Sequence, residues 1–244
     1  MTRTARHTVV ITRAAEQGSG WVERITAAGY HVLEVPVIRI VDPVDGGREL
    51  GDALAHLDQY DWLVVTSANG AARVRDAWHA LAPAARPRLA AVGRATADAL
   101  GGPVDIVATN SSGEGLVEVM PRGAGRVLLA QAEAARNVVR SGLAALGWSV
   151  DAVTAYRTVA APVAPDVVQA AASADAVVFT SGSTVREFVA AAGRAAVPPI
   201  VVSIGPSTTA VADGLGVKVS VTAQQHNLDG VVSALRSVLP PATD

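Results

Sequence analysis

Hydroxyl-bearing residues and glycines follow five short apolar runs of this chain, and each group precedes a stretch with helical periodicity. The groups are Thr66–Ser67, Gly93–Arg94, Asn110–Glu114, Thr180–Ser183 and Gly205–Thr209. The first turn of a helix offers unpaired backbone N–H groups and the positive end of its dipole, and both favour anions. Serine, threonine and asparagine are also ordinary N-cap residues, so one group alone indicates a cap. Five such groups together favour a site for an extended, acidic ligand.

Two arginines and one tyrosine add to these candidates. Arg13 and Arg136 each follow an apolar run, in two segments of the chain that resemble each other. A guanidinium group at such a position can bind a carboxylate or can simply be solvated at a helix start. Tyr156 has Ile38 at the matching position, so it is either a functional phenol or a half-buried aromatic that the fold does not require. The candidate binding residues are Arg13, Thr66, Ser67, Ser111, Ser112, Arg136, Thr180, Ser181, Ser183, Gly205, Ser207 and Thr208.

The elements that would position these residues occur twice in the chain. The segment from Asp61 to Ser67 is repeated from Asp175 to Ser181, and Thr8–Thr12 is repeated at Arg126–Ala130. The separation between matched residues stays between 112 residues (Ala91 and Ser203) and 118 residues (Thr8 and Arg126). This regularity predicts one α/β unit that is duplicated, with the functional site in a cleft between the two lobes.

Apolar runs rich in Val, Ile and Leu alternate with longer helical stretches, which is typical of a parallel sheet covered on both faces. The pattern predicts an α/β protein with ten strands, about five in each lobe. The predicted strands lie near 8–12, 31–37, 61–65, 88–92, 104–107, 126–130, 149–154, 175–179, 199–203 and 217–221. The predicted helices lie near 15–28, 48–57, 69–80, 94–100, 113–120, 135–146, 165–172, 183–192, 206–213 and 227–238.

The sequence leaves open how the repeated segments combine into lobes. A sequential arrangement would divide the chain near Pro121. A nested arrangement would join the first segment to the last and place one lobe inside the other. Two extended segments, Val35–Val41 and Val153–Val159, are followed by proline-containing stretches and could run side by side as a hinge.

Composition excludes several classes of function. The chain has 244 residues, a formal net charge of −2 and no basic run, which argues against nucleic-acid binding. It contains no cysteine, so disulfides and thiolate catalysis are excluded, and its histidines lack the spacing of metal ligands. No apolar stretch is long enough to cross a membrane, and no signal-peptide core precedes the first strand. We therefore expect a cytoplasmic protein without membrane contact.

Six motifs, in this order and spacing, resemble the uroporphyrinogen-III synthase family over about residues 9–235. The motifs are Val-Ile-Thr-Arg13, Val-Val-Thr-Ser67, Ser-Gly-Glu-Gly-Leu116, Ala-Tyr-Arg-Thr158, Val-Phe-Thr-Ser181 and Ser-Ile-Gly-Pro-Ser-Thr208. The resemblance implies two flavodoxin-like parallel-sheet domains, one inserted in the other and joined by a two-stranded hinge. The implied domains are 1–40 with 160–244, and 41–159, with the hinge near 36–47 and 154–164.

The resemblance also implies a reaction. Enzymes of the family are lyases of tetrapyrrole biosynthesis that cyclise and dehydrate hydroxymethylbilane to uroporphyrinogen III, inverting the last pyrrole ring, without a metal or organic cofactor. The tyrosine that matches Tyr156 is the favoured proton donor to the departing hydroxyl, and Thr66 and Ser207 fall where family hydroxyls line the cleft. Gln131 and Ala132 depart from the Arg-Gly-Glu that the family usually has after this strand, which weakens carboxylate binding by that loop.

Two other interpretations remain open at the level of sequence. A two-lobed small-molecule receptor would share the hinge and cleft, and a flavodoxin-like regulatory protein would explain the altered loop at 131–136. Neither explains why a tyrosine replaces the aliphatic residue of the matching segment. We expect a monomeric enzyme, because no long amphipathic surface indicates an obligate dimer.

Overall fold

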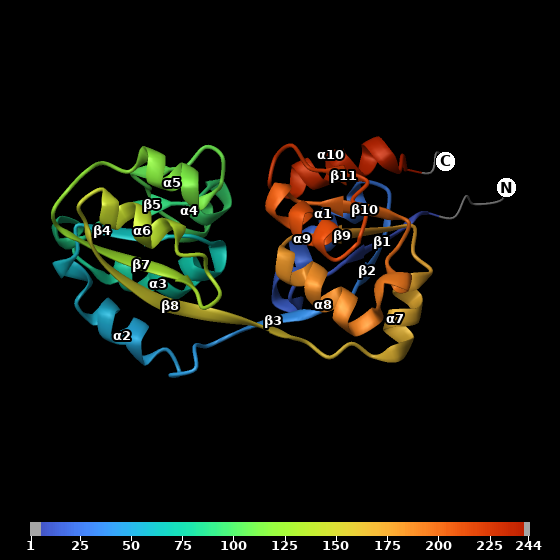
Figure 1. The fold of residues 1–244 in the computed structure, drawn as a ribbon, viewed down its shortest axis with the longest axis horizontal. Coiled ribbons are helices and arrows are strands. Elements are labelled where there is room, and N and C mark those ends of the chain that lie inside the picture. Colours follow the sequence, from blue (N-terminus) through green and yellow to red (C-terminus); the bar gives the residue numbers. More distant parts are fainter. Residues whose placement is uncertain (1–5, 242–244) are drawn as a thin grey trace. The chain divides into compact units, whose positions relative to one another are not determined.

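The computed structural model describes residues 6–241, in which strands and helices alternate (Figure 1). The strands are β1 (Thr8–Ile11), β2 (His31–Glu34), β3 (Ile38–Val41), β4 (Trp62–Val65), β5 (Arg88–Ala91), β6 (Ile106–Val107), β7 (Arg126–Ala132), β8 (Ser149–Ala160), β9 (Ala176–Phe179), β10 (Ile200–Ser203) and β11 (Val221–Thr222). The α-helices are α1 (Ser19–Ala27), α2 (Arg48–Ala55), α3 (Ala68–Ala80), α4 (Arg94–Leu100), α5 (Gly113–Val119), α6 (Val138–Ala145), α7 (Pro165–Ala172), α8 (Gly182–Ala192), α9 (Pro206–Gly214) and α10 (Leu228–Val238). Short 3-10 helices occupy Ala15–Gln17, Leu57–Gln59, Pro83–Ala85 and Arg194–Ala196.

The α/β class with parallel sheets is confirmed, and several predicted elements differ in detail; the strand predicted over 217–221, for example, is β11 at Val221–Thr222 only. The helix predicted over 15–28 is a 3-10 turn followed by α1, and Gly18 lies between them. The extended segment predicted over 31–37 ends as β2 at Glu34, and β3 begins at Ile38 as a separate strand. Pro36 lies between these two strands, and proline has no N–H to contribute to a ladder.

The strands form a five-stranded sheet in the order β11-β10-β9-β1-β2 and a six-stranded sheet in the order β3-β8-β7-β4-β5-β6. The first two strands of the chain therefore share a sheet with the last three. Numbered along the chain, the first sheet has the order 2-1-3-4-5. In the second sheet, the run β8-β7-β4-β5-β6 has the same order when β7 is counted as the first strand. β3 is an additional edge strand beside β8, so this sheet has six strands instead of the expected five.

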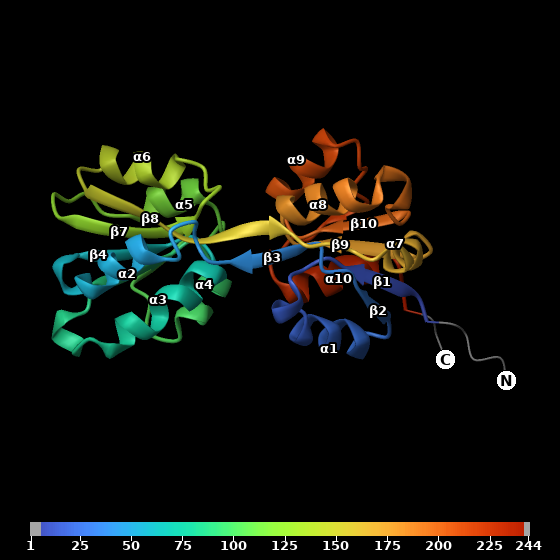
Figure 2. The same ribbon diagram turned by 90° about the horizontal axis from the view of Figure 1, so that it is seen from below.

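The chain divides into two compact units, which we call unit 1 (the residues up to Arg39 and from Val159 on) and unit 2 (Ile40–Thr158). The neighbouring strands β3 and β8 each continue from one unit into the other. Figure 2 shows that these two strands run in opposite directions. The chain thus passes between the units through one pair of hydrogen-bonded strands.

Side chains that alternate along the central strands fill cores on both faces of a sheet. In β4, Leu63 and Val65 belong to one buried cluster, whereas Trp62 and Val64 belong to another on the opposite face. All four are at most 1 % exposed. Such strands have no room for polar side chains, so the chemistry of each unit is confined to the loops at the strand ends.

The duplication is visible in matched contacts at the starts of the strands. Asp61 Oδ2 accepts a hydrogen bond from the backbone N–H of Arg126 at 2.8 Å, and Asp175 Oδ2 accepts one from the N–H of Thr8 at 2.7 Å. The strand registers agree as well, since Val9 pairs with Val32 and Val127 with Val150. One structural frame is therefore used twice, at the separation of 118 residues that the sequence predicts for these strands.

Unit 2 also carries a charged cluster at the start of its strands, and this cluster makes the stability of the protein depend on pH. Arg126 Nη2 donates to Asp151 Oδ2 at 2.8 Å, and the Tyr60 hydroxyl donates to the same oxygen at 2.9 Å. The bonds from Arg126 and then Tyr60 lower the pKa of Asp151. A carboxyl with a lowered pKa stabilises the fold above its unfolded pKa, and this contribution is lost as the pH falls through the folded pKa.

We expect Asp151→Asn to lower the melting midpoint at pH 7 by about 1–4 °C, because the Asp151 side chain is 42 % exposed and solvent weakens such pairs. The difference from the wild type should shrink as the pH falls from about 5 to about 3. Asp58→Asn, at an exposed position, is the control and should leave the midpoint unchanged. Melting curves across this pH range check the prediction, and a difference that persists at pH 3 contradicts it.

Candidate functional site

The candidate residues lie along the carboxyl edge of the sheet in each unit. The strands that precede them are paired in parallel, so their carboxyl ends meet at one edge, where α/β proteins bind ligands. The edge of unit 1 carries Arg13, Thr180, Ser181, Ser183, Gly205, Ser207 and Thr208. The edge of unit 2 carries Thr66, Ser67, Ser111, Ser112 and Arg136, and Tyr156 lies in the last part of β8.

Three of the candidate serines are engaged as helix N-caps. Ser67 accepts a hydrogen bond from the backbone N–H of Gly70 at 3.0 Å, and Ser112 accepts one from Gly115 at 3.0 Å. Ser181 accepts one from Thr184 at 3.3 Å and also bonds the Ser183 hydroxyl at 2.8 Å. These hydroxyls hold the starts of α3, α5 and α8, as the simpler interpretation of the sequence expects.

A second group of hydroxyls is uncommitted. Within residues 6–241, the side chains of Thr66, Ser111, Thr180 and Ser207 donate and accept no hydrogen bond, and each is at least partly exposed. Thr66 and Thr180 occupy matched positions directly before the capping serines. These four hydroxyls are the ones that remain available to a ligand.

Two of the predicted binding residues are covered by protein. Thr208 is only 2 % exposed, so its side chain presents very little surface to a ligand. Gly205 is buried, and a Cβ atom built on it would lie 3.0 Å from the His226 ring. His226 thus covers the start of α9, a position the sequence did not single out. The repeat could have indicated it, because its matched residue is the candidate Ser111.

The two predicted arginines differ in their surroundings. Arg136 is exposed and pairs with Glu114 at 3.1 Å; the backbone at the start of α5 and then Arg136 lower the pKa of Glu114. Arg13 has no carboxylate partner among the described residues. Its Nη2 donates to Gln17 Oε1 at 3.3 Å, its guanidinium lies 4.6 Å from the centre of the Trp21 ring, and burial lowers its pKa.

Tyr156 is buried, with 6 % of its surface exposed, which is less than the half-buried aromatic of the simpler interpretation. It pairs with Ala132 after a register shift in the β7–β8 ladder, and its carbonyl accepts a hydrogen bond from the backbone N–H of Glu133 at 3.0 Å. Its hydroxyl has no hydrogen-bond partner among the described residues. Tyr156 thus lies beside the carboxyl end of β7, and its unpartnered phenol is free to donate a proton to a ligand.

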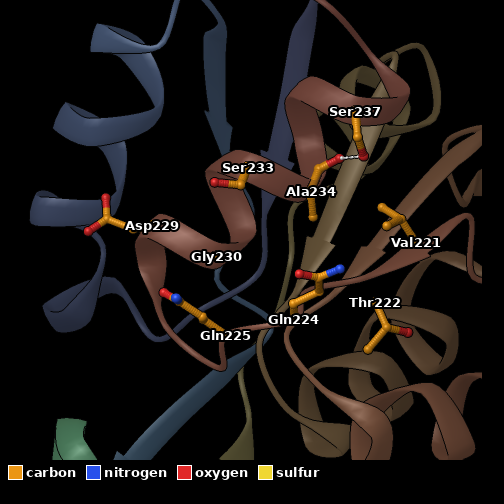
Figure 3. A pocket seen from close by; sticks show the side chains of 9 residues that line it. All are labelled: Val221, Thr222, Gln224, Gln225, Asp229, Gly230, Ser233, Ala234 and Ser237. Atoms are coloured by element: carbon orange, nitrogen blue, oxygen red, sulfur yellow. Dashed lines mark hydrogen bonds between the residues drawn. The ribbon is translucent and has the colours of Figure 1, made fainter.

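A pocket of about 350 Å³ lies in unit 1 between α10 and β11 (Figure 3) and contains none of the candidate residues. Its lining residues are Val221, Thr222, Gln224, Gln225, Asp229, Gly230, Ser233, Ala234 and Ser237. A second pocket, of about 520 Å³, lies in unit 2 beside α2 and is lined by Pro43, Val44, Asp45, Arg48, Glu49, Asp52, Glu133 and Thr154. The described residues contain no cluster of His, Asp and Glu suited to a metal ion and no helix that could cross a membrane.

Comparison with known proteins identifies a family. Residues 19–233 match the family model described as uroporphyrinogen-III synthase HemD. The chain is 31 % identical to the uroporphyrinogen-III synthase of Synechococcus elongatus, covering 93 % of this chain and 94 % of the relative. It is 26 % identical to the chloroplastic uroporphyrinogen-III synthase of Oryza sativa subsp. japonica, covering 95 % and 80 %.

Solved structures share the fold. A mutant uroporphyrinogen III synthase from Thermus thermophilus has a TM-score of 0.63 at 20 % identity and covers 96 % of this chain and 98 % of its own. The uroporphyrinogen-III synthetase of Helicobacter pylori has a TM-score of 0.60 at 16 % identity, with 95 % and 99 % covered. At these identities the likeness concerns the architecture.

The division between capping and uncommitted hydroxyls predicts different effects on stability. Ser67→Ala, Ser112→Ala and Ser181→Ala should each lower the free energy of unfolding by about 1 kcal/mol, because each leaves a helix-start N–H without its cap. Thr66→Ala and Thr180→Ala should change it by less than about 0.5 kcal/mol. Urea denaturation of the five variants measures this, and equal losses in both groups would show that the uncommitted threonines also support the fold.

Proposed function

Because this chain belongs to the uroporphyrinogen-III synthase family, we propose that the carboxyl edges of both sheets bind its substrate and that Tyr156 protonates the leaving group. The protein is a cyclising lyase of tetrapyrrole biosynthesis, and the family acts on hydroxymethylbilane. The observation that carries this function is the family match over residues 19–233, together with a relative 31 % identical over nearly its whole length.

The substrate carries eight carboxylates, and the chain itself has a formal net charge of −2. Attraction by overall charge is therefore absent, and binding must come from local groups. The uncommitted hydroxyls Thr66, Ser111, Thr180 and Ser207 can donate to carboxylates. The adjacent helix starts add the positive ends of their dipoles. We assign the carboxylate contacts to these groups in both units, so that binding is shared and does not depend on one side chain.

The proposed chemistry places few demands on the protein. The hydroxyl of the first ring leaves with a proton, and the resulting electrophile is attacked by the substituted carbon of the last ring. The spiro intermediate then fragments and recloses with that ring inverted. Without the enzyme the bilane closes to the uninverted type I isomer, so the enzyme's main contribution is to hold the bilane in a bent conformation.

Tyr156 is the proposed proton donor for three reasons. Its hydroxyl is unpartnered among the described residues, so no hydrogen bond has to break before the proton moves. Its ring is largely buried, at 6 % exposure for the residue, whereas the unpartnered hydroxyl is not fully buried and can be reached by a ligand. Its matched residue is Ile38, so the repeated fold does not require a hydroxyl at this position.

We further propose that both units are flavodoxin-like domains, one inserted in the other, with β3 and β8 as the hinge. The 2-1-3-4-5 strand order found in each sheet is the flavodoxin-like order and supports this assignment. Since one chain supplies both carboxyl edges, we propose that the enzyme works as a monomer. We also propose a cytoplasmic location, with which the lack of cysteine is compatible. The comparisons give no support to a non-catalytic binding or regulatory protein.

The isomer of the product tests the function. Purified protein is incubated with freshly generated hydroxymethylbilane, and the oxidised products are separated into type I and type III porphyrins. The proposed function predicts type III as the main product, at a rate proportional to enzyme concentration. Type I alone, at the rate of the enzyme-free reaction, would show that the proposed function is wrong.

Tyr156→Phe tests the proton donor. We expect kcat for type III formation to fall by about 100-fold, the usual scale of a lost general acid. The melting midpoint should stay within about 2 °C, because the hydroxyl has no protein partner to lose. Tyr60→Phe is the matched control: it removes a hydroxyl bonded to Asp151 at 2.9 Å and should leave kcat unchanged. An unaltered kcat in Tyr156→Phe would remove Tyr156 from the mechanism.

A further inference from the structure

Arg13 combines a lack of any acidic partner among the described residues with a buried, unpartnered guanidinium nitrogen. Seven other arginines of the described chain pair with a carboxylate, among them Arg24 with Asp229 at 2.9 Å. Among residues 6–241, only the Nε atom of Arg13 is a buried side-chain nitrogen or oxygen atom without a hydrogen-bond partner. A partly buried charge without a counter-ion reduces stability, so its presence indicates that the counter-ion comes from a ligand.

The backbone that carries Arg13 is held firmly at the carboxyl edge of unit 1. Arg13 follows β1, which lies between β9 and β2 in the sheet. The preceding residue, Thr12, is fully buried, and its hydroxyl donates to the carbonyl of Val178 in β9 at 3.0 Å. The chain therefore leaves the sheet at a fixed point, beside the uncommitted hydroxyl of Thr180 that follows β9.

Trp21 holds the side chain of Arg13. Trp21 lies in the first turn of α1, is partly buried, and packs against the main core of unit 1. The guanidinium carbon of Arg13 lies 4.6 Å from the centre of the Trp21 ring, the geometry of a cation–π contact. One face of the guanidinium thus rests on an aromatic ring that the core keeps in place. Nη2 donates to Gln17, and Nη1 donates no hydrogen bond to a described residue and is not fully buried.

The matching positions of unit 2 lack both members of this pair. β1 and β7 have equivalent registers, and Gly29 and Gly147 after α1 and α6 share left-handed backbones, with φ of 101° and 99°. At the same separation of 118 residues, Gln131 matches Arg13 and Val139 matches Trp21. The duplicated fold therefore forms without the cation and without the ring, and the pair is an addition that belongs to unit 1.

We propose that Trp21 is a positioning residue for the reaction and that the Arg13–Trp21 pair is a preorganised receptor for one carboxylate of the bilane. This inference rests on the proposed function and adds a cationic contact to the neutral hydroxyl contacts. The aromatic ring fixes the guanidinium before the substrate arrives, so little side-chain freedom is lost on binding. Because the contact is made before and during the reaction alike, its removal should raise KM and leave kcat nearly unchanged.

Replacing Arg13 and Trp21 with the residues at the matching positions of unit 2 tests the role of the pair. Arg13→Gln should raise KM for hydroxymethylbilane about 10-fold, the scale of one lost charged hydrogen bond. Trp21→Val should raise it about 3–10-fold, because Arg13 remains but is no longer held. The double variant should have the KM of Arg13→Gln, since Trp21 acts only through Arg13. Trp21→Phe retains a ring face and should stay within about twofold of the wild type.

The controls separate positioning from packing. Val22→Ala removes apolar volume from the same helix and the same core without touching Arg13, and its KM should stay at the wild-type value. Should Trp21→Val fail to fold, Trp21→Leu retains more of the apolar volume and gives the same comparison. The proposal is overturned if KM is unchanged in Arg13→Gln. It is also overturned if Trp21→Val raises KM by the same factor in the wild type and in the Arg13→Gln variant.

The wild-type protein is the reference both for the proposed function and for the role of the Arg13–Trp21 pair. If it forms no type III product, the proposed function itself fails, whatever the variants do. If it forms type III product and the variants leave KM unchanged, only the role of the Arg13–Trp21 pair fails. The KM of the wild type should also rise more steeply with salt than that of Arg13→Gln, because one ionic contact is screened.

Discussion

Parallel pairing of buried strands is the constraint on which the rest of this structure depends. Strands such as β4 and β9 are buried over their whole length, so they carry almost no polar side chain. Because neighbouring strands point the same way, the polar loops that follow them meet at one edge of each sheet. Helix starts are at this edge as well, and hydroxyls, N–H groups and Arg13 are gathered there by the fold.

Duplication points to candidate functional residues, because they stand out as differences between two copies of one fold. Tyr156 is matched by Ile38, and the Arg13–Trp21 pair by Gln131 and Val139. A third difference is a cluster of three hydroxyl side chains in unit 1, in which the Thr209 hydroxyl is hydrogen-bonded to that of Ser203 at 2.6 Å and to that of Thr222 at 2.8 Å. The matched residues of unit 2 are Ala91, Ala97 and Val107. Where one copy folds with an apolar side chain, the polar side chain of the other copy is not needed for folding.

Short-range contacts, and not overall charge, are the proposed basis on which this slightly acidic chain binds a polyanion. Most of its ion pairs lie between exposed side chains, where water and salt screen them, and they contribute little attraction at a distance. Hydrogen bonds from fixed hydroxyls and helix starts act only at contact and depend on shape. Under the proposed assignment, contacts of this kind select a particular bent conformation of the substrate, which ring closure requires.

The sequence by itself determined most strands, nearly all helix positions, the repeat and the family, because apolar periodicity and motif order are local properties of a chain. It also provided Arg13, Tyr156 and the hydroxyl side chains as candidate site residues. The tertiary structure decided which strands share a sheet, since both arrangements of the repeat satisfy the same local pattern. In the folded protein, Ser67 caps a helix whereas Thr66 is uncommitted, Thr208 is buried, and Trp21 lies against Arg13. These facts depend on contacts between side chains, whose geometry exists only once the helices are packed on the sheets.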